Sequence, residues 1–140
     1  GPVLELAPTH FMRGRAYASS GRPADAELAY RDALALNPDM PEAAMNLAWH
    51  LLERGQNAEA RALASRVASD HPRAENPWRL LGAAAATAGD GHGTVQAWKR
   101  SLERQPDQPD LWRSLADALT AIGDETGTWE ARSEAARRSH

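Results

Sequence analysis

The chain has 140 residues, a formal net charge of −3 and a sequence pI near 5.9. The length suits one ordinary domain, and this mild acidity argues against a broad electrostatic attraction to nucleic acid or anionic lipid. The absence of cysteine excludes disulfides, thiol catalysis and cysteine-ligated metal. Alanine is abundant and β-branched residues are sparse, which predicts an all-α protein.

The chain opens with a short segment, residues 1–6, that stands apart from the rest of the sequence. Gly1-Pro2 resembles the remnant of a cleaved tag, so the sequence is expected to begin inside a larger protein. Lys99 is the single lysine, which together with the alanine content is typical of a GC-rich bacterial source. No apolar run approaches the roughly 20 residues of a membrane helix, so no membrane insertion is expected. The compartment, cytoplasmic or periplasmic, stays open.

From residue 7 onward, helix-breaking residues recur every 34 positions. The recurring glycines and prolines are Gly21, Gly55, Gly89, Gly123 and Pro38, Pro72, Pro106. Glycine caps the end of a helix and proline cannot continue one, so both residue types have a structural reason to recur. We therefore predict one domain, residues 7–140, with repeats at 7–40, 41–74, 75–108 and 109–140.

Each repeat is expected to contain two helices. Proline is favoured in the first turn of a helix, and Pro8, Pro41, Pro77 and Pro109 mark the start of the first helix of each repeat. The first helices are predicted at 8–20, 42–54, 76–88 and 110–122, and the second helices at 24–37, 57–70, 92–105 and 126–138. The last helix is more polar, with Arg132 in place of an aromatic residue, so we expect the array to end there.

Two glycines, Gly93 and Gly127, fall in the first turn of the third and fourth second helices. Glycine there weakens a helix by about 1 kcal/mol relative to alanine. One interpretation is that these helices start a few residues later, which we favour. The other is that the glycines admit a close contact with a neighbouring helix.

The third repeat resembles the tetratricopeptide repeat, a 34-residue helix–turn–helix unit with a W-x2-L-G pattern, a later aromatic residue and a final proline. The matching residues are Trp78, Leu81, Gly82, Gly89, Trp98 and Pro106. Ala85 and Thr94 depart from the pattern, since a tyrosine and an alanine are usual there. The resemblance implies a right-handed α-α superhelix of four repeats, whose first helices line the concave face.

The resemblance also implies that a peptide or helix of a partner protein binds in the concave groove. The residues expected to contact it are Phe11, Met12, Arg15, Met45, Asn46, Trp49, Arg79, Arg113 and Asp117. Trp49 lies outside the core positions of its repeat, so its ring either edges the groove or packs on Phe11 and Met12. Arg79 and Arg113 either bind a carboxylate or carbonyl of the partner or form ion pairs within the chain.

Narrower functions find little support in the sequence. The two-carboxylate clamp of chaperone-binding relatives is matched outright only by Asn46, and the asparagine ladder of sugar-transferring relatives is absent. The five histidines are scattered without metal-ligand spacing, so no metal, no cofactor and no catalytic residue are expected. We predict a non-enzymatic protein-interaction scaffold. The alternatives are a recruiting or regulatory arm of a larger glycosyl- or sulfotransferase, and a self-assembling adaptor that forms homo-oligomers.

Overall fold

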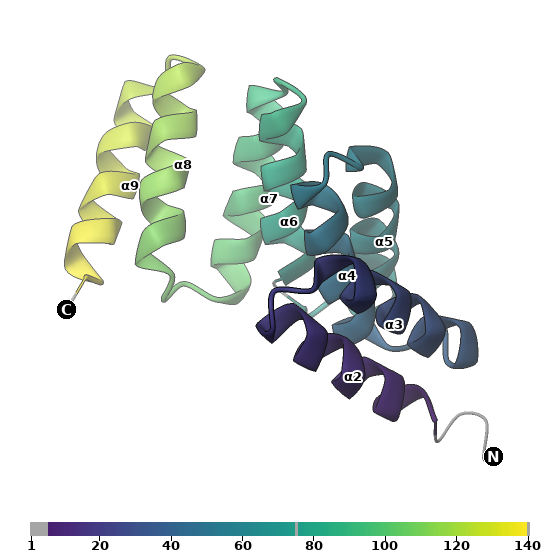
Figure 1. Cartoon of the computed structure of the whole chain (residues 1–140). Coiled ribbons are helices and arrows are strands. Elements are labelled where there is room, and N and C mark those ends of the chain that lie inside the picture. Colours follow the sequence, from purple (N-terminus) through teal and green to yellow (C-terminus); the bar gives the residue numbers. More distant parts are fainter. Residues whose placement is uncertain (1–5, 75, 140) are drawn as a thin grey trace. The chain divides into compact units, whose positions relative to one another are not determined.

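The computed structural model describes residues 6–74 and 76–139, and within them it contains eight α-helices and no strand (Figure 1). The first helix of each repeat, called an A helix below, is α2 (Ala7–Ser19), α4 (Pro41–Glu53), α6 (Asn76–Thr87) or α8 (Pro109–Ala121). The second, or B, helices are α3 (Pro23–Leu36), α5 (Asn57–Asp70), α7 (Gly91–Arg104) and α9 (Glu125–Arg137). Every bound lies within one residue of the prediction, so the all-α class and the helix register are confirmed. The opening segment, apart from Leu6, lies outside the described residues.

The four A helices end in the same way, at the glycines that recur in the sequence. Gly21, Gly55, Gly89 and Gly123 have φ values of 71°, 83°, 78° and 84°. This left-handed conformation carries no Cβ penalty for glycine, and it turns the next N–H back onto the helix. The N–H of Arg22 donates to the carbonyl of Tyr17 at 2.9 Å, and that of Asp124 donates to Leu119 at 2.9 Å. The 34-residue period therefore reflects one repeated turn.

The B helices of the last two repeats begin at Gly91 and Glu125, so Gly93 and Gly127 lie in their first turns. The expectation that these helices start after the two glycines is therefore wrong. The Asp90 carboxylate accepts a hydrogen bond from the N–H of Gly93 at 2.9 Å, and Asp124 accepts one from Gly127 at 2.9 Å. A Cβ on Gly93 would stand 2.3 Å from the Asp90 Oδ2 atom. The glycine thus makes room for a capping carboxylate, which satisfies an N–H group at the helix start.

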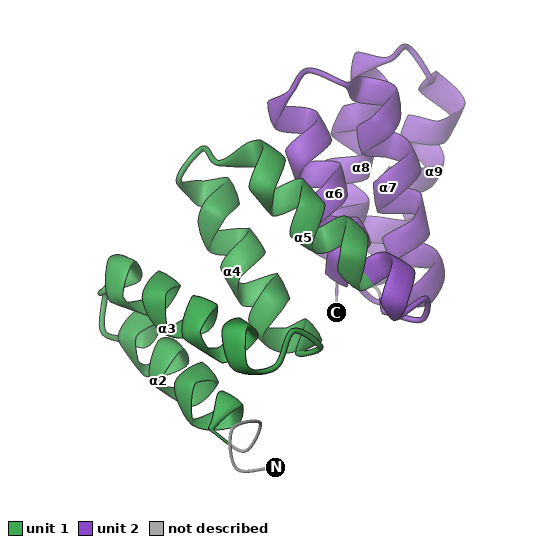
Figure 2. Cartoon of the chain, turned by 90° about the vertical axis from the view of Figure 1, so that its right-hand side faces the viewer, with its two compact units in different colours: residues 1–67 green, residues 68–140 purple. Residues whose placement is uncertain are grey.

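The chain divides into two compact units, Gly1–Val67 and Ala68–His140, and the division falls within α5 (Figure 2). In the first unit α2 packs on α3, and α3 packs on α4. In the second unit α6 packs on α7, α7 on α8, and α8 on α9. None of the described helices is long and apolar enough to cross a membrane.

Each unit packs an aromatic ring of a B helix against a glycine of the preceding A helix. In the first unit a Cβ on Gly14 would lie 2.6 Å from the ring of Tyr30, which also neighbours the Phe11 ring at 6.0 Å between centroids. In the second unit a Cβ on Gly82 would lie 2.2 Å from the ring of Trp98. The glycine in the middle of α2 and the one in the middle of α6 are therefore required for close packing.

Candidate functional site

A cleft of about 390 Å³ lies in the first unit between α2 and α4, with α3 as its floor. Its lining residues are Arg15, Ala18, Ser19, Pro23, Ala26, Tyr30, Asn46, Trp49, His50 and Glu53. Ala26 and Tyr30 are buried, whereas Arg15, Ser19 and Glu53 are exposed. We call this the N-terminal cleft. Its walls carry a cation, a carboxylate, an amide and a large aromatic ring above an apolar floor.

A cleft of about 480 Å³ lies in the second unit between α6 and α8, with α7 as its floor. Its lining residues are Ala86, Gly89, Gly91, Thr94, Trp98, Ser114, Asp117, Ala118 and Ala121. We call this the C-terminal cleft. Its walls are built from small side chains, and Asp117 is their single ionisable group.

The two clefts occupy the same place in their units. Trp98 stands 68 positions after Tyr30 and Asp117 stands 68 positions after Trp49, which is twice the 34-residue period. Ala86, Gly91, Thr94, Ser114, Ala118 and Ala121 likewise follow Ala18, Pro23, Ala26, Asn46, His50 and Glu53. The same helix geometry therefore forms both clefts, and only the wall residues differ.

Polar contacts hold the walls of the N-terminal cleft in place. The guanidinium of Arg15 lies 5.8 Å from the centre of the Phe11 ring, within cation–π range. The Nε2 atom of His50 lies 2.9 Å from a carboxylate oxygen of Glu27, which is largely buried. Glu27 also pairs with Arg31 at 3.4 Å and with Arg54 at 3.5 Å. Residues of α3 and α4 are thus linked directly behind the cleft.

The sequence profile of the tetratricopeptide repeat matches residues 6–140 of this chain. The chain belongs to the tetratricopeptide-repeat family. No curated protein matches it.

Solved structures agree with this family's fold. The chain superimposes on a crystal structure of MamA with a TM-score of 0.87 and 16% identity, covering 95% of this chain and 78% of that one. The structure of MamA residues 41 to the end from Desulfovibrio magneticus RS-1 gives a TM-score of 0.85 at 18% identity, covering 95% of this chain and 75% of that one. Pseudomonas aeruginosa PilF gives 0.87 and 19%, covering 94% of this chain but only 60% of that one. At these identities the likeness shows the tetratricopeptide-repeat fold alone.

The structure brings some of the residues predicted for partner binding into the clefts. Arg15, Asn46 and Trp49 line the N-terminal cleft, and Asp117 lines the C-terminal cleft. These side chains come from α2, α4 and α8, which are A helices, as the family resemblance implies.

Other predicted residues lie elsewhere. Phe11 and Met45 are only 8% and 4% exposed, so they pack beneath the surface, and Met12 is 57% exposed but lines neither cleft. Arg79 donates to the Gln108 side chain at 2.7 Å, and Arg113 contacts both Asp110 and, at 3.0 Å, the Ser139 hydroxyl. The guanidinium groups of these two arginines therefore form hydrogen bonds with side chains of the same chain.

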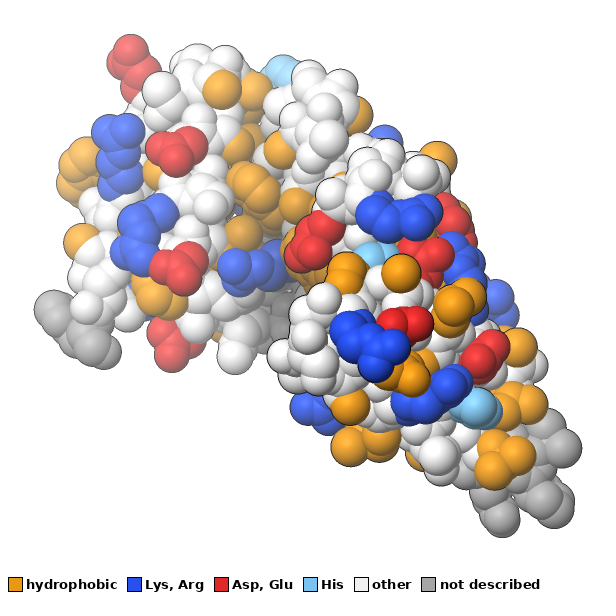
Figure 3. Space-filling view, in the orientation of Figure 1, with side chains coloured by type: hydrophobic (Ala, Val, Ile, Leu, Met, Phe, Trp, Pro, Cys, Tyr) orange, Lys and Arg blue, Asp and Glu red, His pale blue; other side chains and the backbone are white. Residues whose placement is uncertain are grey.

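Sequence reasoning missed His50 and Ala118, which occupy equivalent positions on α4 and α8. Both directly follow a predicted cleft residue, so a wider stripe along the A helices would have included them. Among the described residues, no group of three or more His, Asp or Glu side chains is placed to hold a metal ion. On the face shown in Figure 3, positive and negative side chains are interspersed, and neither sign forms one broad patch there.

Proposed function

We propose that this chain is a protein-interaction scaffold, with residues 7–140 forming one domain of four repeats, and that its two clefts each bind a segment of a partner protein. The observation that carries this proposal is the recurrence of an equivalent cleft, between equivalent A helices, in both units. Clefts of several hundred Å³ with an apolar floor and a few polar groups are typical of binding sites.

The N-terminal cleft suits an extended segment with an apolar side chain. Trp49 offers a large ring at the edge of the cleft, and a partly exposed tryptophan commonly contributes strongly to protein binding. Asn46 both donates and accepts hydrogen bonds, so it can pair with the main chain of that segment. Arg15 and Glu53 supply opposite charges at the exposed rim and set the direction in which the segment lies.

The C-terminal cleft suits a larger apolar side chain next to a hydrogen-bond donor. Ala86, Ala118 and Ala121 leave space above the Trp98 ring that longer side chains would fill. Asp117 is exposed and accepts hydrogen bonds from an amide or a basic side chain. The two clefts therefore select different side chains.

The test starts from peptides selected out of a displayed random library against the wild-type protein, and it keeps those whose binding shifts the NMR signal of the Trp49 indole N–H. We expect Trp49→Ala to weaken binding of such a peptide by about 2 kcal/mol, or roughly thirtyfold in Kd, measured by fluorescence anisotropy. The matched control is Trp129→Ala, because Trp129 is 71% exposed and lines neither cleft. Equal losses from both substitutions, or none from Trp49→Ala, would refute the assignment of the N-terminal cleft.

A further inference from the structure

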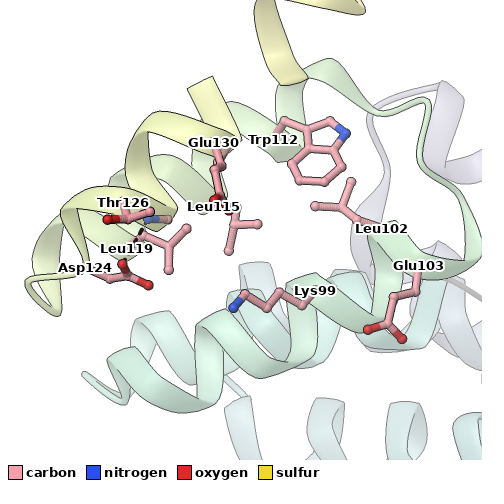
Figure 4. A pocket seen from close by; sticks show the side chains of 11 residues that line it. Lys99, Leu102, Glu103, Trp112, Leu115, Leu119, Asp124, Thr126 and Glu130 are labelled. Carbon is pink, nitrogen blue, oxygen red and sulfur yellow. Dashed lines mark hydrogen bonds between the residues drawn. The ribbon is translucent and has the colours of Figure 1, made fainter. Parts of the chain in front are cut away.

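A third pocket, of about 470 Å³, lies in the second unit on another side of α8, where α7 and α9 flank that helix (Figure 4). We call it the B-helix pocket. Its apolar lining includes Leu102, Trp112, Leu115 and Leu119, which Figure 4 shows around one opening. The indole N–H of Trp112 donates to the carbonyl of Pro106 at 2.7 Å, so the position of this ring is fixed. The pocket shares no lining residue with the C-terminal cleft.

The corresponding place in the first unit carries an ion pair. Arg31 of α3 donates two hydrogen bonds to the Glu59 carboxylate of α5, at 2.7 and 3.2 Å. The residues 68 positions later are Lys99 and Gly127, and both line the B-helix pocket. Glycine offers no carboxylate, so this bridge has no counterpart in the second unit. Lys99 forms no ion pair with any residue that the structure describes.

Acidic side chains outnumber basic ones around the B-helix pocket. Glu103, Asp124 and Glu130 line it together with Lys99, which is three carboxylates against one ammonium group. Within the described part of the chain, neither Glu103 nor Glu130 has an ion-pair partner. An apolar floor with an acidic rim complements an apolar side chain that has basic neighbours.

We propose that the B-helix pocket is a second protein-binding surface, which takes a leucine-type side chain of a partner segment flanked by lysine or arginine. The apolar side chain enters between Leu102, Leu115 and Leu119 and contacts the Trp112 ring. The flanking cations pair with Glu103 and Glu130 at the rim. This surface is separate from the clefts between A helices, so the chain can contact two segments of different chemistry.

The first test compares three short peptides of the same length: Lys-Leu-Leu-Lys, Glu-Leu-Leu-Glu and Lys-Gly-Gly-Lys. Binding is followed by NMR through the Trp112 indole signal and the Leu115 and Leu119 methyl signals. We expect the first peptide to bind at least about tenfold more tightly than either of the others, because it alone satisfies both floor and rim. Equal affinity for the first two peptides would overturn the proposal.

The second test changes the protein. Glu130→Lys should weaken binding of Lys-Leu-Leu-Lys about tenfold, because it places a like charge at the rim. Glu125→Lys is the matched control, since Glu125 is an exposed residue of α9 that does not line the pocket. Unchanged binding by the Glu130→Lys variant would contradict the proposed rim contact.

A third variant transplants the bridge of the first unit into the second. It combines Lys99→Arg and Gly127→Glu with Asp124→Gln. The third change is needed because a Cβ on Gly127 would lie 2.6 Å from the Asp124 carboxylate. Glutamine is chosen because Gln56 is the residue of the first unit equivalent to Asp124. We expect the bridge to close the pocket and to reduce binding at least about tenfold. Retained affinity in a folded variant would overturn the proposal, and Glu130→Lys decides the question if the triple variant unfolds.

Two further measurements separate this surface from its alternatives. Trp49→Ala should leave binding of Lys-Leu-Leu-Lys unchanged, whatever it does in the N-terminal cleft, and a comparable loss would place the peptide there instead. In sedimentation velocity, we expect that Glu130→Lys abolishes no self-association of the wild-type protein. If it does, the occupant of the pocket is a second copy of this chain and the proposal is overturned.

Discussion

In the N-terminal cleft the wall from α4 carries Asn46, Trp49 and His50, whereas in the C-terminal cleft the wall from α8 carries Ser114, Asp117 and Ala118. The floors differ much less. Tyr30 and Trp98 each place a ring against a glycine of the preceding A helix. The comparison teaches that close packing of a ring on a glycine fixes the floor of both clefts, while their walls carry different side chains. Under the proposed function, a few wall residues would therefore distinguish the segments that the two clefts bind.

Each unit buries an equivalent leucine of an A helix, and removing these leucines should give the largest effect. Leu47 and Leu115 stand 68 positions apart and are each 2% exposed. Truncation to alanine should lower the free energy of unfolding by about 2–5 kcal/mol in either unit, because each change leaves a cavity. Denaturant unfolding measures the loss. Leu28→Ala serves as the control, since Leu28 is 61% exposed. If only one of the two buried leucines proves costly, the cores of the two units are not equivalent.

A smaller effect is expected where the aromatic rings meet the A helices. Gly82→Ala should lower the free energy of unfolding by about 1–3 kcal/mol through overpacking against Trp98, even though alanine is the better helix former. Gly14→Ala should do the same against Tyr30. Denaturant unfolding again measures both losses.

Whether Gly82→Ala lowers or raises the free energy of unfolding should depend on the presence of the Trp98 ring. Alanines occupy the equivalent positions in the second repeat, at Ala48 and Ala64, and both are buried. In a Trp98→Ala background, Gly82→Ala should therefore become neutral or stabilising by up to about 1 kcal/mol. A penalty that persists after the ring is removed would show that contact with the ring is not its cause.

These glycines also show how far the sequence could predict the structure. The 34-residue period and the helix bounds followed from Gly21, Gly55 and the recurring prolines, because breaker residues act locally. The role of Gly93 did not, because it depends on the direction of the Asp90 side chain. The burial of Phe11 and Met45 could not be predicted either, because a periodic pattern places a residue on a face of a helix but does not say how deeply its neighbours cover it.

Only part of the candidate site could be predicted from the sequence. Family resemblance pointed to the A helices, and Arg15, Asn46, Trp49 and Asp117 do line clefts. The internal bonds of Arg79 and Arg113 involve Gln108 and Ser139, which lie 29 and 26 positions away in the sequence. No local pattern reveals these two long-range pairs, because they depend on how neighbouring helices pack, whereas the pair of Arg113 with Asp110 spans three positions of one helix.

The starts of the B helices differ between α3 and the last two repeats, and this difference should give the next smaller effect. Asp90 and Asp124 cap α7 and α9 through their carboxylates, whereas α3 starts at Arg22 with no side-chain cap. Asp90→Ala should lower the free energy of unfolding by about 1 kcal/mol, and Asp90→Asn by only a few tenths, because asparagine keeps the accepting oxygen. Thermal unfolding of the two variants measures the difference. Equal losses would mean that the charge, and not the cap, is what matters.

The smallest expected difference concerns the ion pair that the first unit has and the second lacks. The hydrogen bond from Arg31 lowers the pKa of Glu59 below its usual 4.5. A lowered folded-state pKa contributes stability above the unfolded pKa, and this contribution disappears as the pH falls through the folded value. Glu59→Gln should therefore cost stability near neutral pH, by at most about 1 kcal/mol for so exposed a pair, and nothing well below pH 4.5.

Urea unfolding of the wild type and of Glu59→Gln, measured across the acid range, checks this prediction. The informative quantity is the difference between the two proteins, because Glu134 also has a lowered pKa, caused by hydrogen bonds from Arg138 and Arg137, and it titrates in both. Glu125→Gln is the control, since Glu125 is an exposed carboxylate of α9 that forms no ion pair with any described residue. A difference from wild type that stays constant from neutral pH to well below pH 4.5 would mean that the bridge contributes no pH-dependent stability.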